Sequence, residues 1–149
     1  MAQYTTTIKP VTIEAPASKV WKILTDLEKY PEWNPFTVKA ESTLQVGDPV
    51  VLTIPRGGKM TTQTMVLEIL DSPKMIAWRM PKMIHKKMFS AYRVQTIKEI
   101  DPGRCIYETS DTFSGWIAGR IYKMTADYVM ENLTATGAAL KNEAEKKTA

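Results

Sequence analysis

Residues 20–36 read Val-Trp-Lys-Ile-Leu-Thr-Asp-Leu-Glu-Lys-Tyr-Pro-Glu-Trp-Asn-Pro-Phe. The apolar residues of the first half recur at offsets of three and four, which places them on one face of a helix: Val20, Trp21, Leu24 and Leu27. Pro16 suits the first turn of that helix, and Asp26 suits the cap of a second short helix. Because Pro31 disfavours helical geometry at the residue before it, we expect the second helix to end quickly.

Seven other segments, separated by short turns, are predicted to be β-strands. They are residues 4–13, 37–44, 49–54, 61–70, 75–80, 89–100 and 104–113. Pro55-Arg56-Gly57-Gly58 and Asp101-Pro102-Gly103 are typical of hairpin turns, so the sheet is expected to be antiparallel. Residues 116–146 contain no proline and keep a three-to-four apolar spacing, which predicts a helix of about 28 residues and about 42 Å.

Length and composition indicate one globular domain over residues 1–149. The chain has 44% hydrophobic and 24% charged residues, as an ordinary globular protein does. A single cysteine, Cys105, excludes an internal disulfide and points to the cytoplasm. We find no signal peptide and no apolar run near the ~18 residues of a membrane span, so stable membrane insertion is not expected.

Residues 20–36 resemble a characteristic segment of the START-like superfamily (SRPBCC, polyketide cyclase/dehydrase-like), which has the fold of the birch-pollen allergen. Three further stretches carry the resemblance: Ile76-Ala77-Trp78-Arg79, Asp111-Thr112-Phe113-Ser114-Gly115, and residues 138–145 of the last helix. Asp111 stands where many relatives have glutamate, and Thr109 where some have histidine.

The resemblance implies an α+β helix-grip fold. In that fold a seven-stranded antiparallel sheet curls around a long C-terminal helix, and two short helices follow the first strand. The two helices close one end of a cavity that holds small hydrophobic molecules. Such motifs specify the fold and leave the reaction open.

The resemblance also implies that Phe113 faces the cavity. Alternation along the last two strands then turns further residues inward: Ser90, Tyr92, Val94, Cys105, Tyr107, Thr109 and Asp111. An unpaired carboxylate is costly in an apolar cavity, so Asp111 needs either a partner or a raised pKa. A raised pKa would suit acid–base catalysis. The alternative is that Asp111 caps the C-terminal helix or binds loop amides near Gly115.

The candidate catalytic residues are Asp111, Tyr92, Tyr107 and His85. His85 is the only histidine, the residue type whose ordinary pKa lies near neutrality. Two interpretations stay open for it: a proton donor or acceptor at the cavity mouth, and an exposed loop residue among lysines. One histidine and one cysteine cannot supply the usual ligands of a metal, and we expect no metal and no cofactor.

The candidate ligand-binding residues are mostly apolar, and methionine is frequent among them because its flexible side chain adapts to irregular shapes. They are Trp33, Phe36, Met65, Trp78, Met80, Met83, Met88, Ser90, Thr109, Phe113, Ile121, Met124 and Tyr128. Trp33 either walls the cavity or packs the short helices against the sheet. Asn34 is expected to hold its turn through bonds from side chain to backbone.

The formal net charge of +4 is spread along the chain, apart from a cluster at residues 82–87 that is interrupted by apolar residues. Nucleic-acid binders concentrate charge and interleave aromatic residues, so no nucleic-acid partner is expected. The predicted partner is a small hydrophobic ligand or substrate. The chain is expected to be a monomer, or a homodimer that pairs at its first strand.

Two functions follow from this cavity. One is a cyclase- or dehydratase-like enzyme that positions its substrate and assists proton transfer. The other is a carrier that shields a lipid, isoprenoid or polyketide from water. A third option, a stress or toxin-type protein that acts through a partner surface, has less support.

Overall fold

The computed structural model describes residues 2–81 and 87–146, which form eight strands, three α-helices and a 3-10 helix. In chain order these are β1 (Gln3–Thr7), β2 (Val11–Ile13), α1 (Ala17–Thr25), η1 (Leu27–Lys29), α2 (Tyr30–Trp33), β3 (Lys39–Ser42), β4 (Pro49–Arg56), β5 (Lys59–Asp71), β6 (Met75–Arg79), β7 (Ser90–Asp101), β8 (Arg104–Ser114) and α3 (Ala118–Glu145). This order confirms the predicted α+β helix-grip fold.

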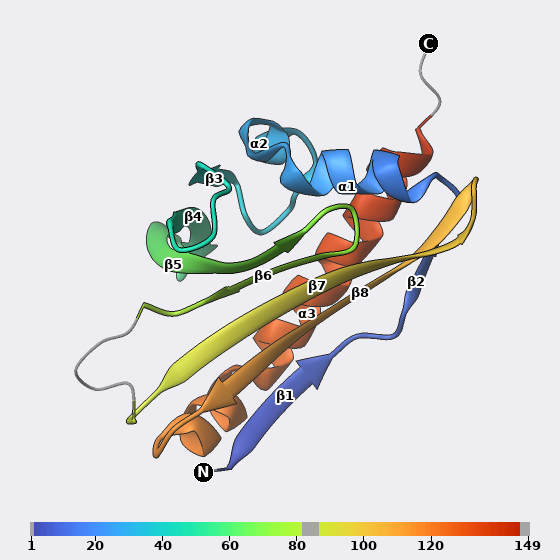
Figure 1. Cartoon of the computed structure of the whole chain (residues 1–149). Helices are drawn as coiled ribbons and strands as arrows, with labels where there is room; N and C mark the ends of the chain where they lie inside the picture. The colour runs from blue at the N-terminus through green and yellow to red at the C-terminus, as the bar shows by residue number, and fades with distance from the viewer. Residues whose placement is uncertain (1, 82–86, 147–149) are drawn as a thin grey trace.

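The strands form one antiparallel sheet that packs against α3. The strand order is β1-β8-β7-β6-β5-β4-β3, with β2 also paired to β8. Figure 1 shows α3 lying along one side of the sheet, with α1 and α2 across one end, near the C-terminal end of α3. Among the described residues, no helix is both long and apolar enough to cross a membrane.

The first predicted strand, residues 4–13, is split into β1 and β2. Both halves pair with β8, but Thr7 lies opposite Ser110 and Val11 opposite Tyr107, so the register changes by one residue between them. Pro10 lies in the break, and proline has no N–H to donate to a ladder.

The segment 20–36 folds largely as its pattern predicts. Val20, Leu24 and Leu27 are buried, with 0%, 1% and 7% of their surface exposed. The second helical stretch ends quickly, as predicted, because α2 follows η1 directly and stops at Trp33. Tyr30 nevertheless keeps helical geometry before Pro31, with φ −54° and ψ −39°. Pro31 lies in the first turn of α2, where the absent N–H removes no hydrogen bond.

The Asn34 side chain holds the turn at the end of this segment, as predicted. The Asn34 side-chain Oδ1 accepts hydrogen bonds from the backbone N–H groups of Phe36 and Thr37, at 2.9 and 2.8 Å. Asp26 occupies the N-cap position of η1 without a side-chain bond to the helix.

Helix α3 covers the sheet with two different halves. Its C-terminal half carries Leu133, Leu140 and Ala144, which are 0–2% exposed. Leu140 and Ala144 pack in the same core as Leu24 of α1. The N-terminal half instead carries Ile121, Met124 and Tyr128, which border a cavity. The site therefore lies under the first half of the helix.

Gly115 links β8 to α3 in a conformation that needs glycine. Its φ is +114°, and a Cβ atom there would lie 2.5 Å from the Met88 carbonyl oxygen. That carbonyl accepts a hydrogen bond from the Ile117 N–H at 3.0 Å. A side chain at this position would both strain the backbone and separate the start of α3 from Met88, just before β7.

The hairpin of β7 and β8 contains one residue more on β7 than on β8. Asp101 pairs with Arg104, but Glu99 pairs with Cys105, so Ile100 is a bulge. Such a bulge reverses the face on which every preceding residue lies. The residues opposite Asp111 and Phe113 are therefore Arg93 and Ala91.

This register corrects one part of the predicted interior. Ser90, Tyr92 and Val94 were expected to face the cavity, but their pairing places them on the opposite face of the sheet. The alternation along β8 was predicted correctly, because Cys105, Tyr107, Thr109 and Asp111 are all buried.

Candidate functional site

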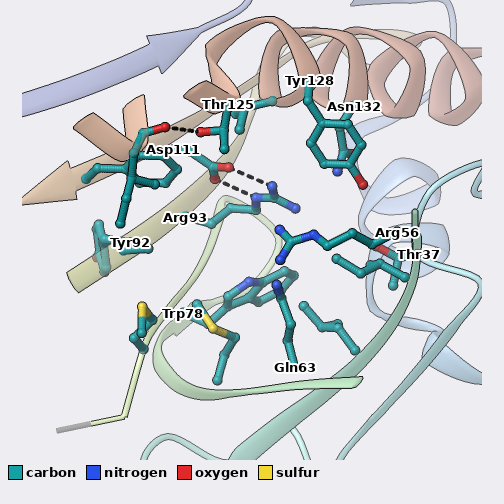
Figure 2. Close-up of a pocket in the computed structure, with 18 of the residues that line it drawn as sticks. Thr37, Arg56, Gln63, Trp78, Tyr92, Arg93, Asp111, Thr125, Tyr128 and Asn132 are labelled. Carbon is teal, nitrogen blue, oxygen red and sulfur yellow. Dashed lines mark hydrogen bonds and ion pairs between the residues drawn. The ribbon is translucent and has the colours of Figure 1, made fainter. Parts of the chain in front are cut away.

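A cavity of about 890 Å³ lies between the sheet and the N-terminal half of α3. Strands β4 to β8 supply its walls, and α3 covers it. Figure 2 shows its side chains converging from the sheet and from the helix. Seven of the predicted ligand-binding residues border this space: Met65, Trp78, Met80, Phe113, Ile121, Met124 and Tyr128.

A buried ion pair lies in the cavity wall. Arg93 of β7 donates two hydrogen bonds to the Asp111 carboxylate of β8, from Nε to Oδ1 at 2.6 Å and from Nη2 to Oδ2 at 2.7 Å (Figure 2). The two side chains are 21% and 11% exposed. This bidentate geometry is the strongest form of a charged hydrogen bond.

Each member of this ion pair compensates for the partial burial of the other's charge. Burial opposes the Arg93 charge, but the carboxylate of Asp111 and its hydrogen bonds outweigh burial and raise the pKa of Arg93. Asp111 thus has the partner that a buried carboxylate needs. The helix-capping interpretation is wrong, since α3 begins after Ile117 with no side-chain cap.

Two predicted site residues of β8 lie behind the cavity. Tyr107 is 0% exposed, packs in the core beside Leu140, and donates a hydrogen bond from its hydroxyl to Gln95 Oε1 at 2.6 Å. Burial raises the pKa of Tyr107 to about 12. Thr109, 2% exposed, lies opposite Gln95. Both side chains face the interior as expected. They lie in the part of the interior that is filled by side chains of α1 and of the C-terminal end of α3.

Tyr92 borders the cavity but is directed to the other face of the sheet. It pairs with Arg79, which forms an ion pair with Glu68 at 3.1 Å. Burial, and then the negative charge of Glu68, raise the pKa of Tyr92. Tyr92 therefore lies on the face of the sheet opposite the Asp111 carboxylate.

The remaining predicted residues that the structure describes do not border the cavity. Trp33 packs edge-on against Tyr30, with ring centroids 5.1 Å apart, as its packing interpretation predicts. Phe36 packs edge-on behind Tyr128 at 6.0 Å. Met88 is 40% exposed, and Ser90 faces outward. His85 and Met83 lie outside the described residues.

Several polar residues of the cavity were not predicted from the sequence. They are Thr37, Arg56, Gln63, Thr64, Arg93, Thr125 and Asn132. Arg93 lies on the same face of β7 as Ala91 and Gln95. Whether that face is the inner or the outer one depends on the Ile100 bulge. Arg56 belongs to a turn, where a charged residue gives no signal of a site.

Within residues 2–81 and 87–146, no three His, Cys, Asp or Glu side chains are grouped as a metal site would need. The polar groups of the cavity are suited instead to an organic ligand. They are guanidinium, carboxylate, amide and hydroxyl groups among apolar walls.

Residues 1–145 match the family described as polyketide cyclase / dehydrase and lipid transport. No curated protein matches the chain.

Solved structures share the fold over nearly the whole chain. The Zhui aromatase/cyclase from Streptomyces sp. R1128 is 24% identical, with a TM-score of 0.77 over 97% of this chain and 94% of that one. A START superfamily protein from Mycobacterium smegmatis is 18% identical, with a TM-score of 0.70 over 95% and 97% of the two chains.

A third structure is norcoclaurine synthase from Thalictrum flavum, in complex with dopamine and hydroxybenzaldehyde. It is 14% identical, with a TM-score of 0.70 over 98% of this chain and 91% of that one. At these sequence identities the structural likenesses establish the fold alone. The family match spans residues 1–145 and establishes the family. The chain belongs to the polyketide cyclase / dehydrase and lipid transport family.

Proposed function

We propose that the cavity binds a small hydrophobic molecule with enolisable carbonyl groups, and that the protein acts on it as a cyclase- or dehydratase-type enzyme. The observation that carries the proposal is the Arg93–Asp111 pair in the wall of an otherwise largely apolar cavity of about 890 Å³. Pockets of this size and lining are typical of sites for small organic ligands.

Asp111 is the proposed base. Its carboxylate takes a proton from a carbon next to a carbonyl group, and the electron pair of that C–H bond forms an enolate. The enolate carbon then bonds to a second carbonyl carbon of the same chain, and that oxygen takes up the proton as it becomes a hydroxyl. Loss of this hydroxyl with a neighbouring proton, as water, completes a dehydration. The apolar walls hold the chain folded, and such positioning supplies much of the acceleration.

Arg93 has two roles in this proposal. It fixes the orientation of the Asp111 carboxylate through both of its bonds. Its positive charge also favours the negative oxygen of the enolate, because electrostatic stabilisation is stronger in a site with little water.

Two of the similar structures support an enzymatic function. One is named as an aromatase/cyclase, and another was solved with dopamine and hydroxybenzaldehyde bound. The second candidate function is a carrier, which is favoured by the apolar majority of the cavity lining. The family description includes both classes.

The test uses 2-tetralone, a bicyclic hydrophobic ketone with acidic α-hydrogens, in deuterated buffer. We expect the protein to accelerate exchange of those hydrogens, followed by NMR, and Asp111→Asn to lower the acceleration about 100-fold, as for loss of a general base. Asp127→Asn, at an exposed carboxylate of α3, is the matched control and should exchange normally.

The same variants separate catalysis from folding. Asp111→Asn leaves Arg93 without its charge partner, and we expect about 3 kcal/mol lower stability in urea. Binding of 2-tetralone by the folded variant shows that the cavity survives. A less stable variant with normal exchange would contradict the catalytic role, and binding without any acceleration by the wild type would favour the carrier.

We further propose that residues 1–149 act as one ligand-binding domain in the cytoplasm. The family match over residues 1–145 and the buried free thiol of Cys105 support this.

A further inference from the structure

The charges of the cavity do not balance. Among the described residues that border it, three are charged: Arg56, Arg93 and Asp111. Arg93 and Asp111 neutralise each other in their bidentate pair. Arg56 therefore leaves this wall with a formal charge of +1.

Arg56 is held at the cavity by a tight turn. It ends β4 and pairs with Lys59 of β5 across Gly57 and Gly58. Both glycines have positive φ, +59° and +79°, as a two-residue hairpin turn requires. Figure 2 shows the Arg56 side chain reaching from this turn into the cavity, toward Arg93 and Trp78.

Arg56 differs from the other arginines of the sheet. Arg79, Arg93 and Arg104 each form an ion pair with a carboxylate. In the part of the chain that the structure describes, no carboxylate lies within 4.0 Å of the Arg56 guanidinium.

A ligand changes the environment of this guanidinium. Arg56 is exposed in the structure, so water can reach its guanidinium until a ligand covers it. An apolar ligand displaces that water, and an unpaired buried charge is then costly. A ligand that carries one negative group at this end removes the cost and gains charged hydrogen bonds.

We propose that Arg56 anchors the ligand through an anionic head group, and that the ligand is an amphipathic monoanion whose head group is a carboxylate. A planar guanidinium binds a carboxylate through two parallel hydrogen bonds. The amide of Gln63 also borders the cavity and supplies further donors. The apolar body then extends along Trp78 and Met65 toward Asp111. This inference rests on the proposed binding of a hydrophobic ligand.

The test compares two ligands of the same shape, 2-naphthaleneacetate and its neutral amide, by isothermal titration calorimetry. We expect the wild-type protein to bind the carboxylate at least ten-fold more tightly than the amide. Arg56→Gln should abolish this preference while leaving the affinity for the amide within two-fold. Arg120→Gln, at an exposed arginine of α3, is the matched control and should keep the preference.

The outcomes separate this inference from the proposed function. If both compounds bind equally well, or if Arg56→Gln keeps the preference, the anchor is wrong and the hydrophobic site stands. If neither compound binds the wild type, the hydrophobic site itself fails, and the anchor with it. Tighter binding of 2-naphthyl phosphate than of 2-naphthaleneacetate would contradict a carboxylate head group.

Discussion

At the scale of the residue, the polar groups in and next to the cavity differ in whether they already have partners. Tyr107 donates its hydroxyl hydrogen to Gln95, and Arg93 donates from Nε and Nη2 to both carboxylate oxygens of Asp111. These pairs compensate for the loss of water on folding. Arg56 has no such ion pair within the described residues, which is why we assign it to the ligand.

Tyr107 predicts how stability depends on alkaline pH. Burial raises its pKa from 10.0 to about 12 in the folded protein. Between these values the unfolded chain loses the phenolic proton first, so the free energy of unfolding falls as pH rises from 10 through 12. The contribution is complete below pH 10, and about 2 kcal/mol of it is lost by pH 12.

The variant Tyr107→Phe tests this by urea unfolding at several pH values. At pH 8 we expect it to be about 1 kcal/mol less stable than the wild type, because Gln95 loses its buried partner. This difference should shrink or reverse by pH 12. Tyr4→Phe, at a half-buried tyrosine of β1, corrects for general alkaline effects. Parallel pH curves for wild type and Tyr107→Phe would contradict the assignment.

At the scale of the element, the β7–β8 hairpin decides which residues meet in the site. A simple hairpin continued from the Asp101–Arg104 pair would place Val94, not Arg93, opposite Asp111. The extra residue, Ile100, moves Arg93 onto the cavity face. The ion pair therefore depends on one bulge near the far end of the hairpin.

Deletion of Ile100 should disrupt this arrangement. We expect the deletion to lower the free energy of unfolding by at least about 3 kcal/mol, or to prevent folding, since either the core face or the Arg93–Asp111 pair is lost. Near-UV circular dichroism and urea unfolding measure this.

The substitution Ile100→Ala is the matched control for the deletion. Ile100 is 44% exposed, so this change keeps the bulge and should cost less than about 1 kcal/mol. A deletion variant as stable as Ile100→Ala would show that the register does not depend on the bulge.

At the scale of the whole molecule, α3 and the sheet together form a packed core at one end and a cavity at the other. Leu140 and Ala144 fill the space beneath the C-terminal half of the helix. The N-terminal half leaves about 890 Å³ unfilled. Such a cavity lacks the packing contacts of a core, so a ligand that fills it stabilises the folded state.

Ligand binding should therefore raise the melting temperature. At a ligand concentration of 100 times Kd, binding adds about 2.7 kcal/mol, which corresponds to about 5 to 10 °C for a chain of this length. Differential scanning fluorimetry with 2-naphthaleneacetate measures the shift. Ala91→Phe, which places a ring in the cavity opposite Phe113, should fold and show a much smaller shift. An equal shift in this variant would indicate binding elsewhere.

The sequence by itself determined the order of the elements, the extent of the last helix and the turn at Asn34. Each of these depends on local signals: apolar spacing, proline, glycine and a side chain that bonds to neighbouring amides. The family resemblance placed Phe113 in the interior, and alternation along β8 then identified Asp111 as an interior residue.

Only the tertiary structure decided which residues meet across strands. Alternation predicts which residues share a face within a strand, but a single bulge reverses that face and leaves no clear mark in the sequence. Arg93 and Asp111 are separated by 18 residues and meet because of strand register. Arg56 belongs to the site because a turn between distant strands directs it inward. Local patterns thus specify the frame, whereas the charges of the cavity follow from how that frame is assembled.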